Sequence, residues 1–242
     1  MNITNIGIIS EGGMISGRIL LIAFFLFFAM FLYSQEEEMP KRIVSISAGL
    51  NNNQSWEVEP SVTYYFCKFL GATLGLNVTN QYNQVGCAGS VIKNSELYWE
   101  MEDSDANVAK FLIRPAISLR TPVLWLNNDH DTGLTIGIEP GLFVALPGNE
   151  QITVNYRDRA HGSIIVDSKR LTNTKGDWLF WNLRGIISLN VDRLIISTGY
   201  SISNFDIYSG RRNIIVENMK LNNKLPLREY TYSSFISFGY CF

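Results

Sequence analysis

The chain has 242 residues, of which 17% are charged and 12% aromatic, and its formal net charge at pH 7 is -2. The charged share lies below the roughly 25% of a soluble globular domain, and near-neutrality without a basic stripe gives no case for a nucleic-acid partner. Three scattered cysteines, Cys67, Cys87 and Cys241, are too few for a disulfide scaffold.

The N-terminal region contains an uncharged run over residues 19–33, which follows Arg18 and precedes an acidic stretch. This length suits the apolar region of a signal peptide and is short of the roughly 20 residues of a spanning helix. We therefore expect a signal peptide over residues 1–34 and one large β-barrel domain over residues 35–242.

Two alternatives stay open for this leader. A membrane-anchoring helix is one, because Leu32 rather than a small residue lies three positions before the expected cut. The second alternative concerns the start of translation: the apolar run lies unusually far from Met1, and a start at Met14 would give a more conventional basic beginning.

Eight segments after the leader alternate large apolar residues with small or polar ones. This period of two predicts strands with one apolar and one polar face. In chain order the segments are residues 42–50, 56–66, 70–81, 111–120, 134–144, 181–189, 194–203 and 230–242.

The links between these segments are of two alternating kinds. Short or fairly short links cover residues 67–68, 121–131 and 190–193. Long links cover residues 82–107, 147–176 and 209–227, and residues 51–55 form the one short link on their side. An even number of strands with short turns at one end and long loops at the other predicts an all-β, eight-stranded antiparallel up-and-down transmembrane β-barrel, which leaves no strand edge unpaired in lipid.

Aromatic residues lie at both expected edges of the membrane. Tyr240 and Phe242, at the end of the last segment, are predicted to lie at the periplasmic interface. Trp56, Trp178 and Trp181 are predicted at the opposite rim.

The final residues "ISFGYCF", together with the leader and the eight alternating segments, resemble the small outer-membrane barrels of Gram-negative bacteria, the opacity-protein and PorT-like group. The resemblance covers nearly all of residues 41–242 and implies a fold and an outer-membrane location rather than a reaction. It implies outer-membrane lipid, lipopolysaccharide and the outer-membrane assembly machinery as partners. Cys241 in the penultimate position is a departure from the usual small or charged residue.

Four charged residues share the polar face at one depth of the expected barrel: Glu59, Arg114, Glu139 and Arg184. At about 3.3 Å per residue they fall near mid-membrane, and we expect Glu139 to lie between the two arginines. Opposite charges that neutralise one another favour a salt-bridged plug over a selectivity ring or a substrate site, which usually has one dominant sign.

Proline follows three of these charges, at Pro60, Pro115 and Pro140. Proline removes a ladder hydrogen bond and normally lies at edges or bulges. We therefore expect bulges that bend the barrel wall at the charged layer.

Residues that could carry chemistry are few. His161 and Ser163 would share a strand face, but the pattern supplies no orienting carboxylate, so a solvated loop is favoured over a lipid-modifying site. Asp129, His130 and Asp131 are possible metal ligands, although a hydrophilic turn explains them equally well. We expect no catalytic residue, no metal and no cofactor.

The predicted function is that of a structural or interaction protein with a side-chain-filled lumen and long extracellular loops that meet an external ligand. The alternatives are a narrow porin-like channel and, less favoured, a lipid-modifying enzyme. A secreted lipocalin-like barrel would need its apolar face inside, whereas the expected inward face carries Gly, Ser and Thr. Charge-rich residues 100–107 and 156–162 are expected to be solvated loop.

Overall fold

The computed structural model describes residues 42–146, 149–173 and 175–242. The predicted signal peptide, residues 1–34, lies outside the described residues. In the described part of the chain no helix is long and apolar enough to cross a membrane. The helical elements there are two short 3-10 turns, η1 (Asp103–Asp105) and η2 (Leu221–Asn223).

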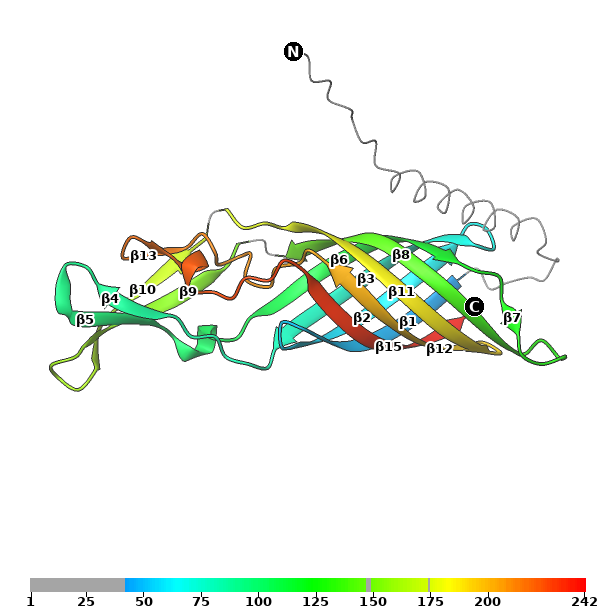
Figure 1. Cartoon of the computed structure of the whole chain (residues 1–242), viewed down its shortest axis with the longest axis horizontal. Helices are drawn as coiled ribbons and strands as arrows, with labels where there is room; N and C mark the ends of the chain where they lie inside the picture. The colour runs from blue at the N-terminus through cyan, green and yellow to red at the C-terminus, as the bar shows by residue number, and fades with distance from the viewer. Residues whose placement is uncertain (1–41, 147–148, 174) are drawn as a thin grey trace, which may run out of the picture. The chain divides into compact units, whose positions relative to one another are not determined.

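Eight strands form a closed antiparallel barrel (Figure 1). Each pairs with its neighbour in the order β11-β12-β15-β1-β2-β3-β6-β8, and β8 pairs with β11 to close the sheet. The predicted eight-stranded barrel is therefore confirmed. The strands are β1 (Arg42–Asn51), β2 (Ser55–Tyr65), β3 (Leu70–Gln81), β6 (Ala109–Arg120), β8 (Thr132–Leu146), β11 (Leu179–Val191), β12 (Leu194–Ser203) and β15 (Thr231–Cys241).

The two faces of the barrel wall differ as the period of two predicts. Along β3, residues alternate between exposed and buried almost without exception. Ile236 and Phe238 of β15 point outward with 55% and 59% of their surface exposed, whereas Phe235 points inward and is buried. The apolar side chains therefore cover the outside of the barrel, and the interior is largely polar.

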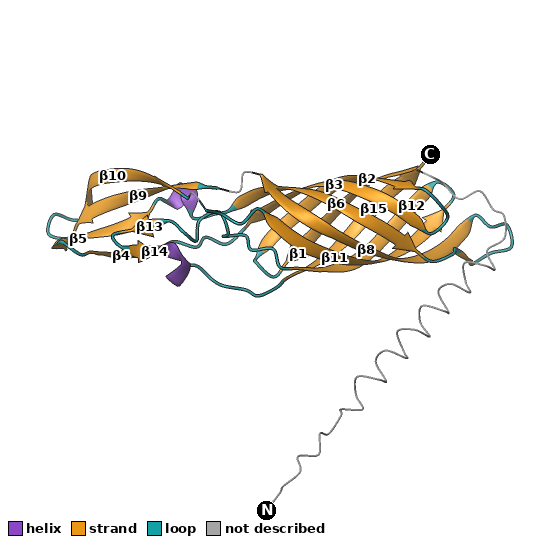
Figure 2. Ribbon diagram, turned by 90° about the horizontal axis from the view of Figure 1, so that it is seen from above, coloured by secondary structure: helices purple, strands orange, loops and turns teal. Residues whose placement is uncertain are grey.

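The long links do not form loose loops but a second antiparallel sheet. It contains β4 (Ala88–Val91), β5 (Asn94–Met101), β9 (Gln151–Asp158) and β10 (Ile164–Thr172), in the order β10-β9-β5-β4 (Figure 2). The third long link adds a small hairpin, β13 (Ile215–Val216) with β14 (Met219–Lys220). We call these elements together the loop-side extension.

The loop-side extension has an apolar core, which continues into the loop-side end of the barrel at Phe143 and Phe180. Trp99 of β5, Val154 of β9 and Ile207 after β12 are completely buried in it. The extension therefore buries its apolar side chains, as a water-soluble domain does, and it begins where the barrel strands end.

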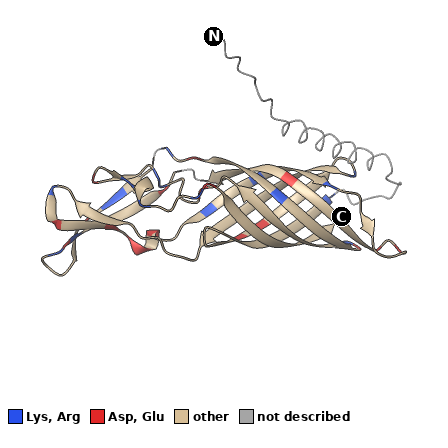
Figure 3. Cartoon of the chain, viewed as in Figure 1, with Lys and Arg blue, Asp and Glu red and all other residues tan. Residues whose placement is uncertain are grey.

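The opposite end of the barrel, which we call the turn side, carries the short links. A two-residue strand, β7 (Leu124–Trp125), pairs there with β8. Long runs of the barrel strands carry no charged residue, and charges recur in the links at both ends (Figure 3).

Candidate functional site

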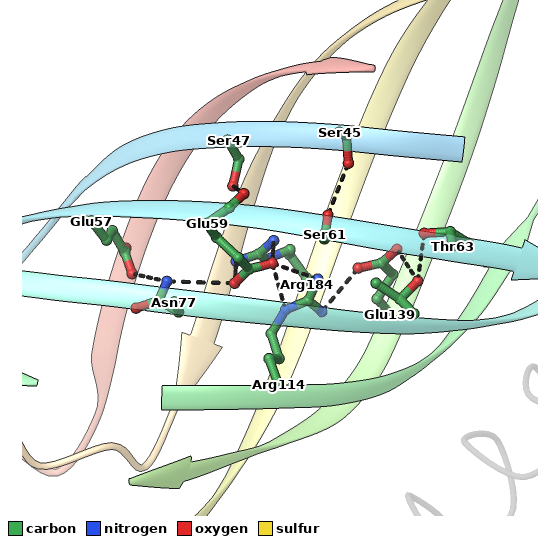
Figure 4. Close-up of polar contacts among 11 residues, drawn as sticks. Ser45, Ser47, Glu57, Glu59, Ser61, Thr63, Asn77, Arg114, Glu139 and Arg184 are labelled. Carbon is green, nitrogen blue, oxygen red and sulfur yellow. Dashed lines mark hydrogen bonds and ion pairs between the residues drawn. The ribbon is translucent and has the colours of Figure 1, made fainter. Parts of the chain in front are cut away.

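The four charged residues predicted at one depth come from four different strands and meet inside the barrel (Figure 4). Glu59 lies on β2, Arg114 on β6, Glu139 on β8 and Arg184 on β11. Glu59 and Arg114 are 1% exposed, and Glu139 and Arg184 are 6% exposed. All four side chains are held inward because each lies on the polar parity of its strand, and register sets Arg184 directly opposite Glu139.

Glu59, rather than Glu139, is the carboxylate shared by the two arginines. Arg184 donates from Nη1 and Nη2 to the two oxygens of Glu59, each at 2.9 Å. Arg114 donates from Nε to Oε1 of Glu59 at 2.9 Å and from Nη1 to Oε2 of Glu139 at 3.0 Å. Glu139 does lie on the strand between those of Arg114 and Arg184, as expected, but it pairs with Arg114 while Arg184 pairs with Glu59, because backbone pairing fixes where a strand residue starts and not where a long side chain reaches.

Small and polar neighbours make room for the shared carboxylate. A Cβ at Gly75 of β3 would lie 2.6 Å from Oε1 of Glu59, so only glycine fits at that position without a shift. Asn77 donates to Oε2 of Glu59 at 3.4 Å, and Thr73 donates to Oε1 of Glu139 at 3.3 Å. Thr73, Gly75 and Asn77, three consecutive inward residues of β3, thus complete the charged layer.

The loop-side half of the lumen is closed by polar side chains and by the segment after β12. The hydroxyl of Tyr208 accepts a hydrogen bond from Gln81 at 2.7 Å, and Asn53 donates to Thr231 at 2.7 Å. The ring of Phe205 packs edge-on against Phe180, with centroids 5.4 Å apart. Solvent therefore has no wide passage from this end.

A second ion cluster joins the barrel to the extension. Lys110 of β6 is 2% exposed and forms an ion pair with Glu150, which also pairs with Arg211. Arg211 donates further to the backbone carbonyls of Asp105 and Asn107. One guanidinium group thus ties all three long links to the rim of the barrel.

The turn-side half of the lumen holds a cavity of about 80 Å³. Its lining is rich in hydroxyl groups, and Glu139 and Arg184 form its inner end. Inward residues of β11 change from buried at Arg184 to half-exposed at Ser188 and Asn190, so water reaches the cavity from the turn side. A space of this size and polarity accommodates several water molecules.

Two of the three arginines that line this cavity, Arg120 and Arg184, also contact aromatic rings. The guanidinium carbon of Arg184 lies 4.5 Å from the ring centroid of Phe235, and that of Arg120 lies 3.6 Å from the ring centroid of Tyr65. Such contacts are favourable when the cation is desolvated.

The predicted interfacial aromatics lie on the outside of the barrel. Trp56, Trp178 and Trp181 are 39%, 57% and 39% exposed at the loop-side ends of β2 and β11. Tyr240 and Phe242 are 38% and 71% exposed at the turn-side end of β15, with ring centroids 4.9 Å apart.

The three prolines produce no bulge. Register is continuous through Pro60 in the pairing of β1 with β2, through Pro115 in that of β3 with β6, and through Pro140 in that of β8 with β11. The prediction of bulges is therefore wrong. A strand residue directs its N–H toward one neighbouring strand, so each proline loses a ladder hydrogen bond on that side alone, and pairing with the other neighbouring strand maintains the register. A local gap in the ladder replaces the bulge: bridges at Glu59 and Pro60 are missing between β2 and β3.

The candidate chemical residues lie in turns. Nδ1 of His161 is 2.8 Å from Oδ2 of Asp158, so an orienting carboxylate is present, but the side chain of His161 is 75% exposed. The hydrogen bond from His161 lowers the pKa of Asp158. Asp129, His130 and Asp131 do not form a metal-ligand group, and no group of three His, Cys, Asp or Glu residues suited to a metal occurs within the described ranges.

Sequence reasoning missed the loop-side extension. Residues 100–107 and 156–162, expected to be solvated loop, include parts of β5 and β9 that bear the buried Met101 and Tyr156. The alternation Trp99, Met101 and Ile152, Val154, Tyr156 is a strand signal in both segments, and it could have identified them.

No family model matches the chain, and no curated protein matches it. Solved structures with low similarity are Neisserial surface protein A (9% identity, TM-score 0.40, covering 85% of this chain and 100% of that one), Ail, the attachment invasion locus protein of Yersinia pestis (9%, 0.36, 84% and 100%), and the outer-membrane enzyme PagL (10%, 0.38, 83% and 99%). The fold assignment rests on the strand pairing described above.

Proposed function

We propose that the chain is an outer-membrane barrel of a Gram-negative bacterium that acts as a structural or interaction protein, with the loop-side extension as its working surface. The observation that carries the proposal is the closed lumen. Glu59, Arg114 and Arg184 occupy its centre as one hydrogen-bonded ion cluster, and the segment around Tyr208 covers its loop-side end. A barrel of eight strands is just wide enough for side chains to fill it.

The exterior of the barrel supports the membrane location. Outward residues such as Ile46, Leu74 and Phe238 are more than half exposed, and such a surface is stable in hydrocarbon but unfavourable in water. We propose outer-membrane lipid and lipopolysaccharide as its surroundings, and export by the leader followed by insertion by the assembly machinery. Membership of the opacity-protein and PorT-like group belongs to the same proposal.

The location is tested by fractionation. The mature chain is expected in outer membranes, with the heat-modifiable mobility in SDS gels that folded barrels have. Deletion of Phe242, or Tyr240→Ser with Phe242→Ser, is expected to lower the amount of folded protein because the last strand loses its interfacial aromatics. Recovery of the intact protein as a soluble periplasmic species would overturn the location.

A narrow channel is the second candidate, and the turn-side cavity favours it. Water already reaches Glu139 and Arg184 from that side, so only the charged layer and the loop-side cover would have to move. Each would need to break several hydrogen bonds between buried charged groups, which is costly. The closed state is therefore the one that we propose.

Conductance in planar bilayers separates the two candidates. We expect the purified protein to give no discrete, ion-selective current steps. Steps whose selectivity changes in Glu139→Gln, which alters a residue at the inner end of the cavity, would establish the channel. Ser188→Ala, a change on the cavity wall without a change of charge, serves as the control.

We propose no enzymatic activity and no cofactor. The His161–Asp158 pair lies in an exposed hairpin turn, and Ser163 next to it has a positive φ of 61° that belongs to the turn. A hydrolytic centre would need a pocket around such a pair to bind its substrate.

A further inference from the structure

Strand β10 is an edge strand of the loop-side extension. It pairs with β9 on one side only, since the sheet order is β10-β9-β5-β4. Eight of its nine residues are exposed. An edge of this kind presents N–H and C=O groups that can extend the sheet with another strand. The N–H of Ser168 donates to Oδ1 of Asp167 at 2.9 Å, and an added strand would replace that hydrogen bond.

The connectivity fixes the direction of β10. Glu150, just before β9, forms an ion pair with Lys110 on the barrel, and its carbonyl accepts a hydrogen bond from Asn173, just after β10, at 3.0 Å. The barrel end of the sheet therefore carries the end of β10 near Thr172. The other end, where Ile164 pairs with Asp158, is the tip that lies farthest from the barrel along the chain.

Symmetry limits how two copies of β10 can pair. A two-fold axis perpendicular to the sheet relates the two strands of such an antiparallel pair. Directly opposed residues then point to the same face of the sheet, and the residue at the axis lies opposite its own copy in the other chain. An axis at Asp167 sets two carboxylates against each other, and an axis at Lys169 or Arg170 sets two cations against each other. An axis at Ser168 places Asp167 of each copy opposite Lys169 of the other, so two pairs of opposite charge form.

We propose that the β10 edges of two copies of this chain pair in antiparallel fashion about Ser168, with Asp167 of each copy opposite Lys169 of the other. The proposal rests on the proposed function, because it makes the extension an outward-facing surface, and it names the partner of that surface. Opposite charges at directly opposed positions stabilise a strand pair, and like charges destabilise it. Within one chain, Asp167 and Lys169 already lie on one face, with Oδ2 and Nζ 3.7 Å apart.

The antiparallel pairing determines where the two barrels lie. Each β10 runs from its tip toward its own barrel, so the tip of one copy lies next to the barrel end of the other. The two barrels are then at opposite ends of the joined sheet. The contact therefore joins chains in two facing membranes and not neighbours in one membrane.

The contact is short. The register of β10 against β9 shifts between Ile165 and Asp167, so Val166 is the extra residue of a bulge that interrupts the edge, and the pairing extends over Asp167 to Lys169. A lysine or a bulge at a sheet edge disfavours pairing with arbitrary strands. On β10 they leave the register about Ser168, in which opposite charges face each other, as the favourable one. Because a single short pair is weak, many copies in two facing membranes are needed for stable attachment.

The test uses the full-length mature chain in liposomes, with aggregation measured by light scattering. Wild-type liposomes are expected to aggregate. Asp167→Lys places lysine opposite lysine at both contact positions, and Lys169→Asp places aspartate opposite aspartate at both. Liposomes that carry either variant alone are therefore expected not to aggregate, like protein-free liposomes. A mixture of the two variant populations is expected to aggregate again, because each Lys of one then faces an Asp of the other.

The controls carry the same charge changes in the β4–β5 hairpin, away from β10. Glu96→Lys and Lys93→Asp, both at exposed positions of the β4–β5 hairpin, are expected to aggregate like the wild type. Failure of wild-type liposomes to aggregate, aggregation by either single variant alone, or no recovery on mixing would each overturn the β10 contact. The proposed function fails separately, through a conducting lumen or a periplasmic location, neither of which depends on Asp167 or Lys169.

Discussion

The barrel and the loop-side extension are both antiparallel sheets of one chain, yet their faces are reversed. In the barrel, Leu74 is 56% exposed on the outside, and Glu59 is 1% exposed inside. In the extension, Trp99 and Val154 are fully buried, and the half-buried pair Arg157–Glu100 lies on the outer face. The difference shows that the strand period reports two unlike faces, while the surrounding solvent decides which of them is the outside.

The two regions also depend on different interactions. The extension is held by burial of apolar surface, worth about 25 cal/mol per Å². The barrel interior contains buried charges, which are favourable only when every partner is present. Removing one side chain from each region should therefore have different consequences, and that difference can be tested.

The largest expected effect is that of Glu59→Ala. It leaves Arg114 and Arg184 buried without their shared carboxylate, and losing one partner of a buried ion pair costs about 3 to 5 kcal/mol. Glu139→Ala should cost about 1 to 3 kcal/mol, because Arg114 keeps Glu59 and the cavity admits water. Urea unfolding of both variants in liposomes measures the difference.

The double variant Glu59→Ala with Arg184→Leu is the control for this prediction. It removes one surplus buried cation and should recover part of the lost stability. A Glu59→Ala barrel as stable as the wild type would mean that the charged layer is solvated.

Trp99→Ala tests the apolar core of the extension. Replacing a fully buried tryptophan by alanine costs about 3 to 5 kcal/mol, which should open the extension to protease while the barrel keeps its heat-modifiable mobility. Tyr98→Ala, a change at the neighbouring half-buried position, should leave protease resistance nearly intact. Simultaneous loss of the barrel would show that the two regions unfold as one unit.

Ile138→Arg tests which solvent meets the barrel wall. Ile138 is 51% exposed beside the charged layer, and an arginine facing lipid at mid-membrane costs about 2 to 4 kcal/mol. The matched change Ile164→Arg in the extension, at a position that is 61% exposed, should cost close to nothing in water. Equal effects on the urea midpoint would contradict the assignment of different solvents to the two regions.

The smallest expected effect is a loss of stability of the extension at alkaline pH. Burial and a hydrogen bond from its hydroxyl to Glu217 raise the pKa of Tyr156 from 10 to about 12. Because the folded state favours the neutral phenol, its contribution to stability is complete below pH 10 and is lost as the pH rises toward 12. Tyr156→Phe should therefore make protease sensitivity of the extension rise less steeply over this range.

The charged layer shows how far parity and depth could be predicted. Counting residues from the turns placed Glu59, Arg114, Glu139 and Arg184 at one level of the lumen, and they meet there. Counting could not say which carboxylate both arginines share, because a guanidinium group reaches several residues across the lumen. The space that Gly75 leaves for Glu59 depends on a neighbouring strand and is invisible in either segment alone.

The sequence by itself determined the eight barrel strands, their inward and outward faces and the positions of the turns, because these follow from local alternation and turn chemistry. Only the tertiary structure decided the rest: the pairing of Glu59 with both arginines, the unbroken register at the prolines, the turn-side cavity, and the folding of the long links into a sheet with an apolar core. These features depend on contacts between residues far apart in the chain, whose energies no local pattern records.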